Sequence, residues 1–227
     1  MRWVRNLFGL AELCLESVCP LCQRSTARVL CCDCQQRLYC LRLAGSEQGW
    51  QPPLPVLAWG AYGGALKRAI AALKYEQQTR LAQPLGHELA QLWLNFAASK
   101  KKSLMVVPIP LHAAKQQQRG FNQAELIAKA FCQHTGLPLQ SHGLIRSRST
   151  EAQFGLSATA REHNLAGAFE LGEPFKTKSP QAVLLLDDIY TTGATARAAA
   201  YTLRRHQISV YGIVVVARAL SSVRTEA

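Results

Sequence analysis

The chain has 227 residues, of which 48% are hydrophobic and 18% are charged, and this composition is typical of a folded globular protein. Its net charge of +12 favours polyanionic partners such as nucleic acids, nucleotides or pyrophosphate. The longest apolar stretches, such as residues 213–217, are much shorter than a membrane helix requires, so we expect no membrane insertion.

The first nine residues contain Arg2 and Arg5, but they lack the apolar core and the small-residue cleavage site of a secretory signal. We therefore expect the protein to stay in the cytoplasm. That compartment is reducing, which bears on the cysteine-rich segment that follows.

Seven of the eight cysteines lie in the first forty residues. Two Cys-x-x-Cys pairs, Cys19 with Cys22 and Cys31 with Cys34, have the spacing that presents four thiolates to one zinc ion. Four thiolates leave no open coordination position, so we predict a structural zinc ion. The segment is too small to fold on apolar burial alone, and the metal would stabilise a zinc-ribbon-like module over residues 1–48.

Three alternatives to this assignment are open. Cys32 could replace Cys31 as a ligand, and Cys14 and Cys40 are further thiols near the two pairs. A disulfide framework is the second alternative, although a reducing compartment favours metal binding. A redox-active pair is the third, but no strand–helix–strand pattern surrounds the first Cys-x-x-Cys.

Strand and helix patterns alternate over residues 49–227. Apolar runs typical of buried strands occur at 56–62, 104–109, 183–186 and 208–217. Apolar residues with helical spacing occur at 66–73, 81–96, 122–136 and 194–206. This alternation indicates one α/β domain with a mostly parallel sheet and helices on both faces. We expect residues 172–180 to be a surface connection.

Basic residues follow the strand that ends near Pro108. Lys115 and Arg119 flank three glutamines in a segment that we expect to be a loop, at the strand end where groups reach a bound anion in open α/β sheets. The alternative is that Lys115 and Arg119 are ordinary solvent-exposed surface residues that bind no ligand. Further along, Arg146, Arg148 and Arg161 lie in a segment with few apolar residues, which could form a hood above the sheet and contact the substrate or a nucleic-acid phosphate.

The most informative segment spans residues 183–195. Its four apolar residues predict a buried parallel strand, and Asp187 and Asp188 follow at the carboxyl end, where ligands bind in open α/β sheets. Residues 191–195 then lead into a helix whose free N–H groups would bind a phosphate, while the two acids suit the vicinal hydroxyls of a ribose. The alternative is that the acids merely end a strand and cap a helix.

These residues resemble the signature of type I phosphoribosyltransferases. Together with the segments Val107–His112 and Arg119–Ala124 and the cysteine pairs, they resemble the ComF competence-protein family, whose members join a small zinc module to a phosphoribosyltransferase-like domain. Weaker matches to the family's pattern are Leu73–Tyr75, Arg148, Thr150, Gln153, Leu156, Arg161, Asn164, Ala168 and Phe169.

The resemblance implies that phosphoribosyl pyrophosphate binds with Mg²⁺, which neutralises the pyrophosphate. Asp187 and Asp188 would hold the ribose hydroxyls, and the pyrophosphate would face the loop from Pro108 to Lys115. In 6-oxopurine transferases the position corresponding to Thr191 is an aspartate that acts as general base, and this chain has no carboxylate there, which disfavours such a purine-salvage role. The 5-phosphate would be bound along Tyr190, Thr191, Thr192, Gly193, Ala194 and Thr195.

Two functions follow from these observations. The first is a phosphoribosyltransferase that acts in DNA uptake or in nucleotide-related metabolism and releases pyrophosphate. The second is a non-catalytic module that binds single-stranded DNA and keeps the transferase fold as a nucleotide sensor. By the same resemblance, the zinc module could dock a helicase-like competence protein.

Overall fold

Four parallel strands form the centre of the protein. The structure is a computed structural model and describes residues 17–97, 104–148, 167–177, 180 and 182–220. Neighbouring strands of the central sheet are parallel at every pairing, which confirms the predicted fold class. The order of the sheet is β3 (Val56–Ala61), β8 (Ser209–Arg218), β7 (Ala182–Tyr190) and β4 (Met105–Pro108).

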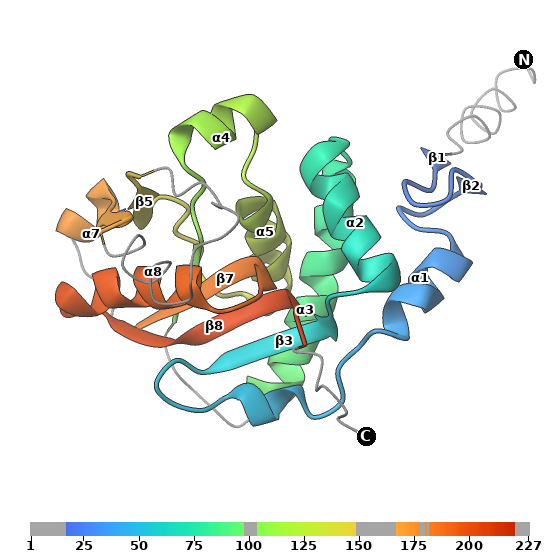
Figure 1. Cartoon of the computed structure of the whole chain (residues 1–227). Helices are drawn as coiled ribbons and strands as arrows, with labels where there is room; N and C mark the ends of the chain where they lie inside the picture. Colours follow the sequence, from blue (N-terminus) through green and yellow to red (C-terminus); the bar gives the residue numbers. More distant parts are fainter. Residues whose placement is uncertain (1–16, 98–103, 149–166, 178–179, 181, 221–227) are drawn as a thin grey trace, which may run out of the picture.

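Helices lie on both faces of this sheet, as the alternating pattern predicted (Figure 1). One face is covered by α2 (Gly64–Tyr75), α3 (Ala82–Ala97) and α5 (Gln123–Thr135). The other is covered by α8 (Ala194–Arg205), by α7 (Glu173–Thr177) and by the antiparallel pair of β5 (Leu144–Arg146) and β6 (Phe169–Leu171).

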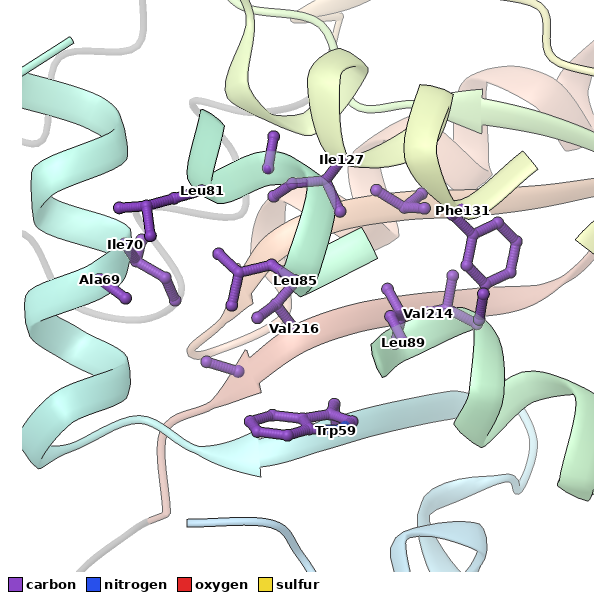
Figure 2. Packing of buried hydrophobic residues seen from close by; sticks show 14 of the residues in the cluster. Trp59, Ala69, Ile70, Leu81, Leu85, Leu89, Ile127, Phe131, Val214 and Val216 are labelled. Atoms are coloured by element: carbon purple, nitrogen blue, oxygen red, sulfur yellow. The ribbon is translucent and has the colours of Figure 1, made fainter. Parts of the chain in front are cut away.

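The pleat of each strand divides the core into two clusters. Leu184 and Leu186 of β7 pack with the helices of the first face, whereas Val183 and Leu185 pack toward α8. Figure 2 shows the first cluster, in which the ring of Trp59 lies near residues of α3 and β8. Because successive side chains of a strand point to opposite faces, the same alternation sets the direction of every polar residue farther along β7.

Both edges of the sheet are covered by backbone. At the β3 edge the amide of Ala61 donates to the carbonyl of Leu41, at 2.8 Å, and at the β4 edge the amide of Val106 donates to the carbonyl of Pro138, at 2.8 Å. Covered edges cannot pair with strands of other chains.

Three local expectations differ from the structure. Strand β7 does not stop before the acids but continues to Tyr190, because the long β8 pairs with it as far as Arg218. The segment expected to be a loop is the helix α4 (Ala113–Arg119), since Ala, Lys, Gln and Arg are good helix formers. The expected surface connection at 172–180 contains the short helix α7.

The N-terminal elements are small. A two-stranded hairpin of β1 (Ser17–Val18) and β2 (Ser25–Thr26) precedes α1 (Cys32–Tyr39), and α1 lies beside α2 (Figure 1). Short 3-10 helices follow at Ser46–Gly49 and Thr79–Leu81. None of the helices in the described part of the chain combines the length and the apolar character that crossing a membrane requires.

Candidate functional site

The two acids of β7 lie on opposite faces of the sheet. Asp188 continues the row of Leu184 and Leu186 and contacts residues of α2 and α5, whereas Asp187 lines a cavity with residues of α8. The alternation of a strand requires this separation. On the neighbouring side β4 stops at Pro108, opposite Leu186, so the two acids lie just beyond the end of the adjacent strand.

Asp188 is enclosed by partners from separate helices. It is 3% exposed, and its Oδ1 accepts a hydrogen bond of 3.0 Å from Nε2 of Gln123 on α5. Its Oδ2 has no hydrogen bond of ordinary geometry and lies instead against the ammonium of Lys74 on α2, as an ion pair. Arg119, at the end of α4, donates in turn to Oε1 of Gln123. We call Lys74, Arg119, Gln123 and Asp188 the Asp188 network.

Asp187 has a different environment. Its side chain is half-buried, and its Oδ1 accepts from the backbone amide of Asp188 at 2.8 Å. Burial and the neighbouring Asp188 carboxylate raise the pKa of Asp187 well above the ordinary value, against an opposing effect of Lys74. Arg146 on β5 is the nearby cation, and burial lowers its pKa although the charge of Asp187 opposes the change. An additional cation near Asp187 would therefore be favourable.

Residues 191–193, which we call the Thr–Gly loop, connect β7 to α8 and border a narrow cavity beside Asp187. The loop leads into α8, whose N-cap, Gly193, has a φ of 76° and provides no capping side chain. The Tyr190 hydroxyl would lie only 2.1 Å from a Cβ at Gly193, so a side chain there would meet both strained backbone and the phenol. The cavity is only about 30 Å³, and its lining includes Asp187, Tyr190, Thr191 and Thr195.

Two further contacts fix Tyr190 and the loop in place. The guanidinium of Arg218 lies over the ring of Tyr190, 5.8 Å from its centroid. The guanidinium of Arg197 donates to the carbonyl of Thr192 at 2.8 Å. Thr191 and Thr192 are exposed, while Ala194 and Thr195 are half-buried at the start of α8. Amides at the start of a helix and nearby hydroxyls are suited to bind an anion, once the phenol moves aside.

The predicted cations are separated by the structure. Arg119 lies in the Asp188 network, whereas Lys115 is exposed on the surface of α4. Lys74 and Gln123 were not among the predicted site residues, and Arg146 was predicted only as part of a hood above the sheet. Lys74 and Gln123 do lie in segments that match the ComF pattern, but helical spacing alone cannot show which turn of α2 or α5 meets the end of β7. Of the family matches, Thr150, Gln153, Leu156, Arg161 and Asn164 lie outside the described residues.

The predicted cysteine ligands converge on one point. The sulfurs of Cys19, Cys22, Cys31 and Cys34 all lie within 4.8 Å of one another. Zn–S bonds of about 2.3 Å in a tetrahedron separate neighbouring sulfurs by about 3.8 Å, so the cluster suits a zinc ion. Cys31 rather than Cys32 joins the cluster, because Cys31 is the N-cap of α1 and Cys32 lies exposed in its first turn.

The thiols of this cluster have unequal pKa values. Burial acts to raise the pKa of Cys19, but backbone hydrogen bonds from Cys31, Leu21 and Cys22 prevail and lower it to about 6. Burial and the neighbouring thiols raise the pKa of Cys34. A thiolate at Cys19 is therefore available at neutral pH as a first metal ligand.

The cysteine segment is part of the main core. Cys19, Leu30, Cys34 and Leu38 belong to the same cluster of buried residues as Trp59 on β3. Larger cavities, of about 390 and 450 Å³, lie between this segment and α2 and α3, away from both acids. The division of the chain at residue 48 stays a prediction.

Comparisons with known proteins agree with the sequence pattern. The chain is 27% identical to DNA utilization protein YhgH of Escherichia coli over 212 residues, which cover 89% of this chain and 91% of that protein. It is 26% identical to competence protein F of Haemophilus influenzae over 90% of this chain and 93% of that one. Competence protein ComFC of Bacillus subtilis is 27% identical over 82% of this chain and 71% of that one. This chain is a homologue of these proteins. The predicted resemblance to the ComF family is thereby confirmed, although no model of a protein family matches the chain.

Solved structures that resemble this chain at low similarity include two phosphoribosyltransferases and a UMP synthase. Orotate phosphoribosyltransferase of Mycobacterium tuberculosis is 18% identical, with a TM-score of 0.35 and coverage of 67% of this chain and 63% of that one. Adenine phosphoribosyltransferase of Thermoanaerobacter pseudethanolicus is 14% identical, with a TM-score of 0.38 and coverage of 66% and 73%. UMP synthase of Leishmania donovani is 20% identical, with a TM-score of 0.35 and 67% of this chain matched, but this chain spans only 24% of its length. At these scores the likeness carries no conclusion about activity.

Proposed function

We propose that the protein binds phosphoribosyl pyrophosphate at the carboxyl end of β7 and acts in the cellular handling of DNA. The observation that carries the first part is the cavity that Asp187 shares with the Thr–Gly loop at the start of α8. A carboxylate and a set of helix-start amides, side by side, match a ligand that has a diol next to a phosphate. The names of the homologues and the net charge of +12 support the second part.

In this proposal the loop binds the sugar and its 5-phosphate. The amides and hydroxyls of residues 191–195 donate to the phosphate, and Asp187 accepts from the ribose hydroxyls. Tyr190 would turn away from Gly193 to admit the phosphate. Its ring would then cover the bound sugar and exclude water from it.

Magnesium fits one of the two acids. Mg²⁺ prefers oxygen ligands and is commonly held by one or two carboxylates together with substrate phosphates. Asp187 is half-buried at the cavity and its raised pKa would fall toward the ordinary value beside a cation, so it suits this role. Asp188 does not fit, because Gln123 and Lys74 already occupy its two oxygens. When bound, the ion would neutralise charge on the pyrophosphate.

The reaction that this site supports is transfer of the ribosyl phosphate to an acceptor, with release of pyrophosphate. Its oxocarbenium-like transition state would be stabilised by the fixed charge of Asp187 and by placement of the reacting groups. Thr191 offers no carboxylate as a general base, so the acceptor would be a nucleophile that needs none.

Calorimetric titration with phosphoribosyl pyrophosphate and Mg²⁺ tests this proposal. The wild type should bind, and Asp187→Asn should bind at least about tenfold more weakly, because a charge-assisted acceptor is lost. The matched control is Asp33→Asn, which makes the same change at an exposed aspartate on α1 and should leave the affinity unchanged. A wild type that gives no binding signal at millimolar ligand would refute the proposal.

A second candidate function is a non-catalytic nucleotide sensor that binds single-stranded DNA. The names of the homologues favour it. The Asp188 network favours it too, because it occupies one of the two acids expected to bind the sugar. The alternatives differ in two measurements. An enzyme releases pyrophosphate when the acceptor is present, whereas a sensor binds phosphoribosyl pyrophosphate without release. Binding of DNA by phosphate contacts should weaken steeply as salt concentration rises, which a series of gel shifts would record. The cytoplasmic location and a helicase-like partner of the cysteine segment stay parts of the proposal.

A further inference from the structure

Two cations are tethered to Asp188 from different helices. Lys74, in the last turn of α2, pairs with Oδ2 directly. Arg119, the last residue of α4, reaches Oδ1 through the side chain of Gln123. One buried carboxylate thus determines where both positive groups lie.

Both cations retain hydrogen-bond donors for a ligand. An ammonium carries three N–H donors and a guanidinium five, and Asp188 and Gln123 each use a small part of these sets. The side chain of Lys74 is 16% exposed, so it is held by the protein and part of it still reaches solvent. Arg119 is likewise only partly buried.

Arg119 also contacts the residue next to Lys74. The guanidinium of Arg119 lies 5.4 Å from the centroid of the Tyr75 ring, and Tyr75 directly follows Lys74 in the chain. Tyr75 is 73% exposed, so this corner of the protein is open to solvent. Asp188, to which both cations are tied, directly follows Asp187 along β7, and β4 ends opposite Leu186, before both acids.

We infer that Lys74 and Arg119 bind the diphosphate group of the substrate, and that Asp188 is a positioning residue for these cations rather than a ligand of the ribose. This inference rests on the proposed function. It assigns the diphosphate to the two tethered cations and not to Lys115, which is exposed on α4. Tethered cations lose less conformational entropy when they bind an anion than a free surface lysine does.

The inference predicts that different variants affect different parts of the substrate. Titrations would use inorganic pyrophosphate and ribose 5-phosphate as separate probes, both with Mg²⁺. Lys74→Met should weaken binding of pyrophosphate at least about tenfold and binding of ribose 5-phosphate less than about twofold, because a charge-assisted contact to one probe alone is lost. Lys74→Arg should restore most of the pyrophosphate affinity.

The variant Asp188→Asn distinguishes two alternative roles of this acid, positioning of Lys74 and binding of the ribose hydroxyls. If Asp188 positions Lys74, this variant weakens binding of pyrophosphate and spares ribose 5-phosphate. If Asp188 instead holds the ribose hydroxyls, ribose 5-phosphate is the probe that is lost, and the inference is wrong. The double variant Lys74→Met with Asp188→Asn leaves no unpaired buried charge, so it keeps the test valid if Lys74→Met alone does not fold.

One matched control, Lys67→Met, and one discriminating variant, Lys115→Met, each remove a lysine elsewhere. Lys67→Met changes an exposed lysine of the same helix, and Lys115→Met changes the exposed lysine of α4. Both should bind pyrophosphate as the wild type does. A folded double variant with unchanged pyrophosphate affinity, or a tenfold loss in Lys115→Met, would overturn the inference while ribose 5-phosphate binding still supports the proposed function. A wild type that binds neither probe nor phosphoribosyl pyrophosphate would instead refute the proposed function itself.

Discussion

The cysteine cluster and the Asp188 network are both groups of ionisable side chains, and they are assembled in opposite ways. The four thiols come from sixteen consecutive residues, in which a hairpin and the start of α1 bring them together. The Asp188 network takes one residue from a strand and three from three different helices. The first lies in a short segment that could hold a metal ion, and the second depends on the packing of the whole domain.

Because of this difference, the two groups should contribute to the free energy of unfolding in different ways. A metal bound by nearby residues supplies folding free energy to its own segment. A buried ion pair gives little net stability, because desolvation of the charges offsets their attraction, but loss of one partner is costly. We expect the cysteine cluster to respond to metal removal and the Asp188 network to respond to charge imbalance.

Removal of the metal should give the largest effect. Structural zinc contributes about 10–16 kcal/mol of apparent binding free energy in zinc-finger peptides, so a strong chelator or Cys34→Ser should unfold the segment around α1. Thermal unfolding with and without chelator would measure this effect. The control is Cys40→Ser, which changes an exposed thiol outside the cluster. An unfolding curve that chelation leaves unchanged would contradict the predicted structural zinc site.

Loss of the charge on Lys74 should be next in size. Lys74→Met leaves Asp188 buried without its cation, which costs about 3–5 kcal/mol for a broken buried pair. Urea unfolding would measure the change in the free energy of unfolding. Lys67→Met, at an exposed position, should stay within about 0.5 kcal/mol of the wild type. Equal effects of the two substitutions would mean that the ion pair has no structural role.

Removal of both charges should restore much of that loss. In the double variant Lys74→Met with Asp188→Asn, the new amide can still accept from Gln123, and no charge is left unpaired. We expect a free energy of unfolding within about 1–2 kcal/mol of the wild type. The double-mutant cycle gives the coupling energy directly. Additive losses would show that Lys74 and Asp188 act independently.

The substitution Asp187→Asn should change the free energy of unfolding by a smaller amount, which depends on pH. Its folded-state pKa lies above the unfolded value, so its contribution to stability is complete below the unfolded pKa and is lost as pH rises through the folded pKa. Asp187→Asn should therefore be more stable than the wild type near neutral pH, and the difference should vanish in acid. Asp187 keeps part of its surface in water, which limits the size of the change. Urea unfolding between pH 4 and 8, with Asp33→Asn as control, would show whether the two curves converge in acid.

The substitution Tyr190→Ala should give the smallest effect, a change in the affinity for ribose 5-phosphate. Because its phenol lies against Gly193, we expect that a phosphate binding to the loop must displace it, which would lower the apparent affinity. Tyr190→Ala should raise the affinity for ribose 5-phosphate by about threefold, as titration would show. Tyr201→Ala removes an exposed tyrosine from α8 and serves as the control. A fall in affinity would mean that Tyr190 contributes more as a contact to the ligand than it obstructs the loop.

Several parts of the fold could be predicted from local pattern. The buried strands are runs of apolar residues, Asn122 caps α5 by accepting from Ala124 at 3.0 Å, and Gly136 ends that helix with a φ of 73°. These features depend on neighbours within a few residues. Helix α4 was wrongly expected to be a loop, although its composition favours a helix, because the adjacent Pro108 and Pro110 suggested irregular chain.

The amino-acid sequence alone determined which residues carry the chemistry: the cysteine pairs, the acids of β7 and the Thr–Gly loop before α8. Each of these is a short-range pattern, and local spacing is sufficient to define it. Only the tertiary structure decided how the acids differ. The pleat turned Asp187 toward the loop and Asp188 toward Lys74 and Gln123, and no spacing along the chain reveals which helix turns will meet the end of a strand.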